Sequence, residues 1–154
     1  WRLGYIGASK KIADACTKVQ GQFTSATCSI TQKAAIAAMD ADPIVLKDMI
    51  AAFANRRTLV LDALNIIEGV KTNMPGGAFY VFPDVSYFYG KSYNGKVIEN
   101  GSDLCLYLLD EALVALVTGE AFGDDNCIRI SYAASEETLT EAMKRIKAAL
   151  EKLV

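Results

Sequence analysis

One arginine lies in a stretch that otherwise has the pattern of a β-strand. Between Asn126 and Ala133, Ile128 and Ile130 share one face of an alternating pattern, and Arg129 lies on the other face. A guanidinium on a half-buried surface needs an anion, and its planar fork matches a carboxylate or phosphate held by two parallel hydrogen bonds. This stretch alone favours an internal salt bridge to Asp or Glu, with a bound ligand as the alternative.

Two other motifs could contribute to binding. Arg56 and Arg57 are adjacent in a predicted helix, where a solvated face is the simplest interpretation and anion binding is the alternative. Gly76 and Gly77 follow Pro75 in a predicted turn. They serve either the turn alone or a close approach of the backbone to a ligand, and the sequence does not decide between the two.

Nucleophile pairs and zinc sites that depend on histidine are excluded, because the chain contains no histidine. The four cysteines have apolar neighbours and no C-x-x-C spacing, so we predict free, reduced core residues and no metal site. They are Cys16, Cys28, Cys105 and Cys127.

Length and composition are those of a globular protein. The 154 residues suit one domain, 52% of them are hydrophobic, and the net charge is -2. This composition is typical neither of a nucleic-acid-binding surface nor of a disordered chain. We therefore expect small neutral or anionic partners and no nucleic acid. We find no apolar run of about 18 residues, no signal peptide and no polybasic anchor, and expect no membrane partner. The reduced cysteines indicate a cytoplasmic location.

Helices and short strands must position these residues. Apolar spacing predicts helices over 9–21, 29–40, 42–69, from Ser102 or Asp103 onward, and over 135–153. Predicted strands are a weak one over 2–8 and clearer ones over 78–82, 115–117 and 126–133, with a long exposed loop over 87–101. This order predicts a two-layer α/β domain.

Three helix starts carry capping signals. Ser29 with Gln32 matches a capping box, Asp42 precedes Pro43 at a first helical position, and Ser135 opens the last helix. The last helix should present one apolar stripe to the sheet. Its members are Leu139, Met143, Ile146, Leu150 and Leu153.

Several motifs together resemble a known family. They are Trp1-Arg2-Leu3-Gly4-Tyr5, Gln22-Phe23-Thr24-Ser25, Pro75-Gly76-Gly77-Ala78-Phe79-Tyr80, Gly119-x-x-Phe122-Gly123 and Ile128-Arg129-Ile130-Ser131-Tyr132-Ala133. In this order and at these separations the chain resembles the C-terminal part of a class I, fold-type I pyridoxal-phosphate aminotransferase. The resemblance covers essentially the whole chain and is greatest to the bacterial type of aspartate aminotransferase.

The resemblance implies a fold and roles for two residues. It implies that residues 1–41 form the end of the large cofactor-binding domain and that residues 42–154 form the small C-terminal domain. The small domain would be an α/β (α+β) unit with a short mixed or antiparallel sheet covered by helices. Arg2 matches the arginine that binds the phosphate of pyridoxal 5'-phosphate, and Arg129 matches the one that binds the substrate α-carboxylate. The implied reaction is transamination between an amino acid and a 2-oxo acid by a homodimer.

The resemblance also implies what this chain lacks. The family's Schiff-base lysine lies about eight positions before the residue matched by Arg2, and Lys10 and Lys11 lie on the wrong side of it. We therefore predict no catalytic residue in this chain and expect it to be inactive alone. We also expect it to be a piece of a longer protein, with exposed apolar surface around Leu3, Tyr5 and Ile6.

Other interpretations stay open. One is a non-enzymatic carboxylate-binding or regulatory module with an aminotransferase-like fold. Another is an aromatic or alanine aminotransferase, because no residue of the chain marks recognition of a distal carboxylate. The choice of aspartate rests on overall resemblance.

Overall fold

The computed structural model describes residues 2–154, so Trp1 of the first motif lies outside the described residues. The chain forms two compact units, Trp1–Lys47 and Asp48–Val154, here called the N-terminal unit and the C-terminal unit. The predicted domain boundary after residue 41 stays a prediction about a larger fold.

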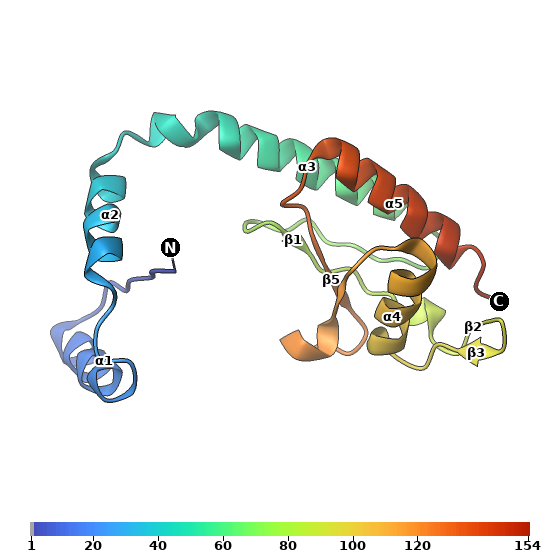
Figure 1. Ribbon diagram of the computed structural model, residues 1–154, viewed down its shortest axis with the longest axis horizontal. Helices are drawn as coiled ribbons and strands as arrows, with labels where there is room; N and C mark the ends of the chain where they lie inside the picture. The colour runs from blue at the N-terminus through green and yellow to red at the C-terminus, as the bar shows by residue number, and fades with distance from the viewer. Residues whose placement is uncertain (1) are drawn as a thin grey trace. The chain divides into compact units, whose positions relative to one another are not determined.

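The N-terminal unit consists of helices. Its elements are α1 (Lys10–Phe23), α2 (Ser29–Asp40) and a 3-10 turn, η1 (Pro43–Leu46) (Figure 1). The strand predicted over 2–8 is wrong, because these residues have no strand partner among residues 2–154. In the described part of this unit the only buried side chain is Thr31, and Leu3, Tyr5 and Ile6 are exposed as predicted.

The capping predictions had mixed outcomes. Asp42 accepts a hydrogen bond from the Ile44 N–H, and Ser135 accepts one from the Thr138 N–H, so both caps are confirmed. The capping box at Ser29 is wrong, because Ser29 is the first helical residue and Cys28 occupies the N-cap position without a side-chain cap hydrogen bond. The cap of the fourth helix is Asn100, which accepts from the Asp103 N–H at 2.9 Å.

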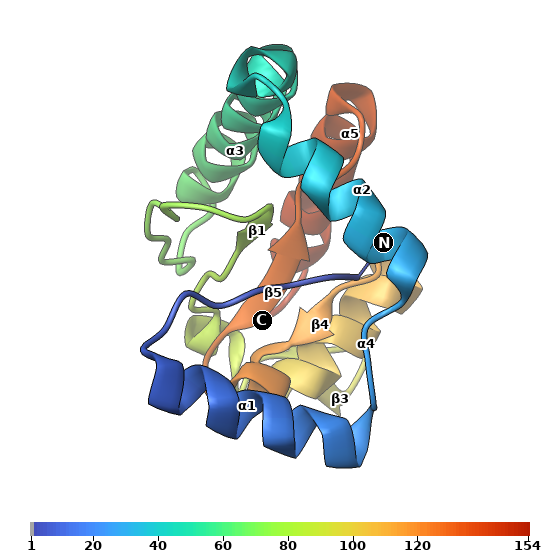
Figure 2. The same cartoon turned by 90° about the vertical axis from the view of Figure 1, so that its left-hand side faces the viewer.

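The C-terminal unit has a small antiparallel sheet at its centre. Strand β5 (Ile128–Ser131) lies between β1 (Tyr80–Val81) and β4 (Val117–Thr118), as Figure 2 shows. The register pairs Tyr80 with Ser131 and Val117 with Arg129. Helices α3 (Lys47–Asn65), α4 (Gly101–Ala112) and α5 (Glu136–Leu150) complete the unit, and α3 and α5 lie side by side in both views (Figures 1 and 2).

The predicted loop over 87–101 contains more structure than expected. It holds a 3-10 turn, η2 (Ser86–Phe88), and a hairpin of β2 (Ser92–Tyr93) and β3 (Lys96–Val97). The hairpin turn is Asn94-Gly95, and both residues have positive φ, +50° and +79°. Asn-Gly is the residue pair that a tight type I′ hairpin turn requires, so the sequence did contain this signal.

The hydrophobic core lies wholly within the C-terminal unit. Val60 and Leu64 of α3, Leu104 and Leu108 of α4, and Ile130 of β5 are nearly inaccessible to solvent. The apolar stripe predicted for the last helix is confirmed, because all five of its members are buried, four of them in α5 and Leu153 just after its end. Three helices thus cover one face of the sheet, and the other face of β5 remains available.

Candidate carboxylate-binding site

Arg129 lies in the middle of the central strand, on the face that the helices do not cover. Its neighbours Ile128 and Ile130 are buried in the core, whereas Arg129 is half-buried and Ser131 is exposed. Cross-strand partners share a face, so Val117 and Tyr80 lie on the same side as Arg129. The alternation read from the sequence is therefore confirmed in the structure.

Two aromatic rings approach the guanidinium, one from β1 and one from the turn that follows β4. The Arg129 Cζ atom lies 4.4 Å from the ring centroid of Tyr80 in β1 and 4.1 Å from that of Phe122. Phe122 belongs to η3 (Gly119–Phe122), the 3-10 turn that follows β4, and Phe82 meets its ring edge-on at 6.2 Å. The rings remove water from the guanidinium and attract it by cation–π interaction, while its in-plane N–H groups stay suited to an anion.

The internal salt bridge favoured by the strand pattern is not formed. Among residues 2–154, no carboxylate lies within 4.0 Å of the Arg129 guanidinium, and no hydrogen-bond acceptor is in contact with it. Burial raises the pKa of the nearby Cys127 thiol to about 11, so at neutral pH this side chain carries no charge that could serve instead. Arg129 is thus a partly desolvated cation without an internal anion.

Gly119 places the turn that carries Phe122. A Cβ atom at this position would lie 2.2 Å from the Asp124 carbonyl oxygen and 2.3 Å from the Cys127 carbonyl oxygen. The Gly119 N–H donates to Cys127 O at 2.8 Å, and the Asp124 N–H donates back to Gly119 O at 3.2 Å. Only glycine permits this close approach, which explains the first glycine of the Gly119-x-x-Phe122-Gly123 motif.

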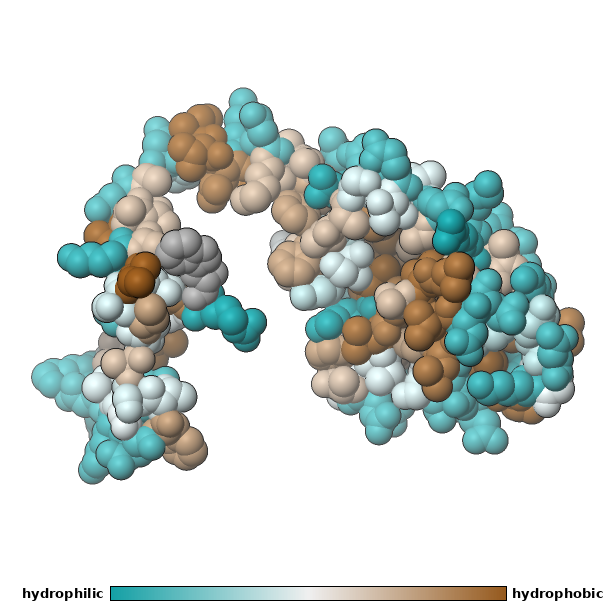
Figure 3. All heavy atoms as spheres, viewed as in Figure 1, coloured by the Kyte–Doolittle hydropathy of each residue, from teal (hydrophilic) through white to brown (hydrophobic). Residues whose placement is uncertain are grey.

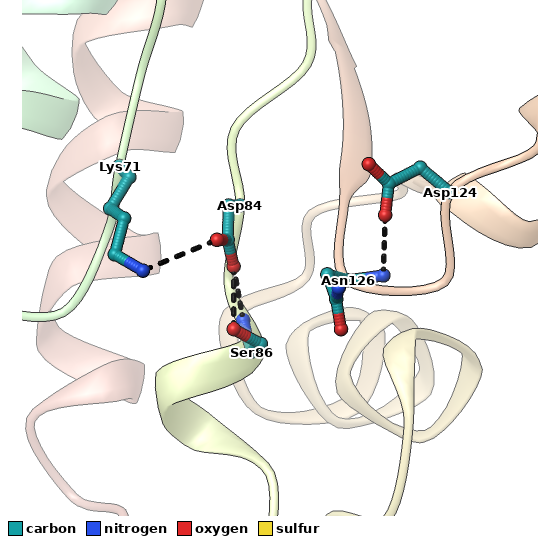
Figure 4. A network of polar contacts seen from close by, with 5 residues as sticks. All are labelled: Lys71, Asp84, Ser86, Asp124 and Asn126. Carbon is teal, nitrogen blue, oxygen red and sulfur yellow. Dashed lines mark hydrogen bonds and ion pairs between the residues drawn. The ribbon is translucent and has the colours of Figure 1, made fainter.

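A polar network braces the chain just before β5, as Figure 4 shows. The Asp84 carboxylate accepts hydrogen bonds from the Ser86 N–H at 2.9 Å and the Ser86 hydroxyl at 2.7 Å, and it forms an ion pair with Lys71 at 3.4 Å. The Ser86 hydrogen bonds, with a smaller contribution from Lys71, lower the pKa of Asp84. Asp124 accepts from the Asn126 N–H at 3.0 Å, and Asn126 O accepts from the Val85 N–H, so the two loops are joined.

Tyr89 adds a second brace to the same loop. Its hydroxyl donates to the Asp125 carbonyl oxygen at 2.7 Å, and burial raises the pKa of Tyr89 to about 12. The hydroxyl therefore remains a donor throughout the neutral range. Together with the Asp84 network, this fixes the turn between η3 and β5.

Arg2 lies in the N-terminal unit and Arg129 in the C-terminal unit. Arg2 is exposed, has a left-handed backbone with φ of +57°, and takes part in no ion pair among residues 2–154. An exposed guanidinium that no carboxylate neutralises is chemically suited to a phosphate dianion. Lys10, in contrast, forms an ion pair with Asp14 at 2.6 Å within α1.

The simplest interpretation of the arginine pair, a solvated face, is wrong. Arg56 and Arg57 are both half-buried, and the Nε atom of each is buried without a partner among the described residues. Arg56 stacks on the Phe53 ring at 5.4 Å, and Arg57 donates to the Pro75 carbonyl oxygen at 2.9 Å. α3 thus directs one of its two arginines to the turn that contains the glycine pair.

The cysteine prediction is correct only in part. All four thiols are free, but only Cys127 is buried; Cys105 is half-buried and Cys16 and Cys28 are exposed. The two exposed thiols belong to the N-terminal unit, whose described residues provide no core. Residues 2–154 hold no cluster of candidate metal ligands, and none of their helices is both long enough and apolar enough to cross a bilayer.

Sequence reasoning missed the two rings beside Arg129. The sequence predicts a strand at Tyr80 and a glycine-flanked motif at Phe122, and links neither residue to Arg129. The alternation of Tyr80 and Phe82 on the two sides of the buried Val81 was the available signal for Tyr80. No local pattern indicates that Phe122 reaches the same guanidinium, because that contact depends on the turn at Gly119.

The fold and site define a class of protein: a helix-covered antiparallel sheet whose central strand presents an arginine suited to a carboxylate. Residues 1–146 match the family model described as "Aminotransferase class I and II", and the chain belongs to that family.

Relatives agree with this assignment. The chain is 52% identical to a bifunctional aspartate aminotransferase and glutamate/aspartate-prephenate aminotransferase of Petunia hybrida, over 97% of this chain and 32% of that protein. It is 44% identical to an aspartate aminotransferase of Rhizobium meliloti strain 1021, over 99% of this chain and 38% of the relative. The chain thus spans about a third of the length of these curated relatives.

Solved structures confirm the predicted fold class. The crystal structure of an aspartate aminotransferase from Rhizobium meliloti superposes with a TM-score of 0.85 at 42% identity, over 96% of this chain and 37% of that one. An aromatic aminotransferase from Pyrococcus horikoshii superposes with a TM-score of 0.77 at 32% identity, over 94% and 37%. The resemblance stated from the sequence motifs is thereby confirmed.

Proposed function

We propose that the chain provides the substrate-carboxylate site of a pyridoxal-phosphate-dependent aminotransferase. The observation that carries the proposal is Arg129, a half-buried guanidinium flanked by two rings and unpaired with any carboxylate in residues 2–154. Burying a charge without a counter-ion is costly, and a substrate carboxylate would supply the missing anion. Membership of the aminotransferase family supports this choice of ligand.

Arg129 would act by orientation. Tyr80 and Phe122 cover the guanidinium, so a carboxylate binds best in its plane through two parallel hydrogen bonds. Two parallel bonds fix the rotation of the amino acid as well as its position, and they thereby select which bond at its Cα atom can react. The small sheet supports this geometry, because β5 is paired on both sides.

Pyridoxal 5'-phosphate would supply the chemistry, withdrawing electrons so that the amino group can pass from an amino acid to a 2-oxo acid. Arg2 is the residue of this chain suited to hold its phosphate, because it is exposed and unpaired in the described structure. Arg2 would retain the cofactor through charge-assisted hydrogen bonds and takes no part in proton transfer.

We propose aspartate as the amino donor and a cytoplasmic homodimer as the working form. The names of the Petunia and Rhizobium relatives include aspartate aminotransferase, which supports this substrate. An aromatic or alanine substrate is the alternative within the family, and a non-enzymatic carboxylate-binding module is the alternative outside it. The names of two structural relatives, an aromatic and an alanine aminotransferase, keep the first alternative open.

The proposal is tested by a chimera. The matching 38% of the Rhizobium meliloti aspartate aminotransferase is replaced by this chain, and kcat/KM is measured with L-aspartate and a 2-oxo acid. We expect activity in the chimera and a loss of about 100-fold or more in kcat/KM for Arg129→Met, since a charge-assisted bidentate contact is removed. The 154-residue chain alone should show no transamination.

Arg145→Met is the matched control. Arg145 lies on the surface of α5 and pairs with Glu141 at 2.7 Å, so its loss should leave kcat/KM within about twofold. A folded chimera whose Arg129→Met and Arg145→Met variants have equal activity would contradict the assignment of Arg129. Retention of pyridoxal phosphate by an Arg2→Met chimera, equal to that of the parent, would contradict the assignment of Arg2.

A further inference from the structure

Side chains from two other elements hold the segment that leads into β1. Arg57 of α3 donates from Nη1 to the Pro75 carbonyl oxygen at 2.9 Å. At the other end of the segment the Tyr132 hydroxyl donates to the Ala78 carbonyl oxygen at 3.0 Å, and the Tyr132 N–H donates to Phe79 O at 2.9 Å. The glycine pair thus lies between two fixed points.

The segment needs these contacts, because packing does not hold it. Ala78 has a left-handed backbone with φ of +61°, which is unfavourable for a residue with a Cβ atom. Gly76 and Gly77 are exposed, and a Cβ atom on either would meet nothing within 4 Å. A cavity of about 330 Å³ borders Gly76 to Phe79, so a released segment would have room to move.

A continuous set of ring contacts joins this segment to Arg129. The Phe53 ring of α3 lies 6.2 Å from Phe79, and Phe79 lies 4.5 Å from Tyr80. Tyr80 in turn lies 4.4 Å from the Arg129 guanidinium. A shift of the backbone at Ala78 or Phe79 therefore reaches the ring that covers Arg129.

The neighbouring arginine provides an internal comparison. Arg56 and Arg57 have the same side chain on the same helix, and each has a buried Nε atom without a partner in the described residues. Arg57 alone of the two donates to the Pro75 segment, whereas Arg56 stacks on Phe53 and makes no hydrogen bond within residues 2–154. The burial of the Arg57 charge thus coincides with one specific contact.

We propose that Arg57 is a positioning residue for the carboxylate site: by fixing Pro75, together with Tyr132 at Ala78, it holds the Tyr80 ring against the Arg129 guanidinium. This inference rests on the proposed role of Arg129 as an anion site. Arg57 itself touches neither the carboxylate nor Arg129. It acts through the backbone of residues 75 to 80.

The test uses the 154-residue chain labelled with ¹⁵N. In the absence of ligand, the chemical shift of the Arg129 Nε–Hε resonance reports how close the aromatic rings lie to the guanidinium. The change of this shift during titration with acetate gives a dissociation constant. We expect Arg57→Met to move this resonance toward the value of an exposed arginine and to weaken acetate binding about fivefold. Arg57→Lys, which keeps a donor for Pro75, should restore most of both effects, and Tyr132→Phe should act like Arg57→Met.

Arg56→Met is the matched control: Arg56 stacks on Phe53 but makes no hydrogen bond to the Pro75 segment, so its loss should change the Arg129 resonance and the acetate affinity much less than Arg57→Met does. Equal resonance positions in the parent and in a folded Arg57→Met variant would overturn the inference, even if acetate binds. Equal changes for Arg56→Met and Arg57→Met would also overturn it, because they would show a general effect of helix stability. If acetate binds nowhere but Arg57→Met still moves the resonance, the positioning role stands and the proposed function of Arg129 fails.

Discussion

The two units of the chain differ in how they use apolar residues. The C-terminal unit buries many of its large apolar side chains in one core of three helices and a sheet. The N-terminal unit, in the part the structure describes, leaves Phe23 at 83% exposure and Met39 at 65%, and brown side chains are visible on its surface in Figure 3. The same amphipathic patterns therefore give a self-supporting fold in one unit, whereas in the other they give helices without a core.

This difference explains why, within residues 2–154, Arg129 has a fixed environment and Arg2 does not. Arg129 is held by strand pairing, ring contacts and a glycine turn, all within the unit that has a core. Arg2 precedes the first helix and has no such support among the described residues. We therefore expect the C-terminal unit to supply nearly all of the cooperative stability of this chain.

The largest expected effect comes from a pair of glycines, one in each unit. Gly119→Ala forces a Cβ atom against two carbonyl oxygens and should lower the free energy of unfolding by about 3 kcal/mol or more. Gly21→Ala lies in α1 with nothing within 4 Å, and should instead raise helix content. Urea denaturation followed by circular dichroism measures both. A Gly119→Ala variant as stable as the parent would show that the turn is not as tight as described.

Two valines, one in each unit, test whether only the C-terminal unit has a core. Val60 is 0% exposed in α3, and Val60→Ala should cost about 2 kcal/mol of unfolding free energy through lost burial and the cavity left behind. Val19 is 58% exposed in α1, and Val19→Ala should change the unfolding free energy by less than about 0.5 kcal/mol. Equal costs in the two urea transitions would break the distinction between the units.

The smallest expected effect is on the stability of the chain at acidic pH, through the Asp84 carboxylate. The folded pKa of Asp84 lies below its ordinary value of 3.8, so its charged form contributes stability that is fully present above that value and lost as the pH falls through the folded pKa. Asp84→Ala should cost about 1 kcal/mol at pH 7 and flatten the loss of stability below about pH 4. Parallel pH profiles for the parent and the variant below pH 4 would contradict this role for the network.

The sequence predicted much of the C-terminal unit because its signals are local. The apolar stripe of α5 and the alternation around Arg129 each come from one element, and the structure confirms both. The caps at Asp42 and Ser135 also follow from adjacent residues. Such a pattern can be predicted from sequence because it arises when one face of a single element is buried.

The remaining features depend on contacts distant in the sequence. Phe122 reaches Arg129 only because Gly119 lets two backbone segments approach, and Arg57 reaches Pro75 from eighteen positions away. The predicted strand over 2–8 failed for the opposite reason: its alternation was present, but no partner strand lies in the described residues. The hairpin at Asn94-Gly95 is different, because its turn signal is local even though the surrounding residues have no strand pattern.

The central claim is that Arg129 of this chain binds a carboxylate. The most direct measurement follows the Arg129 Nε–Hε resonance of the 154-residue chain during titration with acetate and, separately, with acetamide, which has nearly the same shape but no charge. We predict a saturable shift with acetate at a dissociation constant in the millimolar range, about 4 kcal/mol or less of binding, and no saturable shift with acetamide. Equal responses to the two compounds, or no response to either, would contradict the claim.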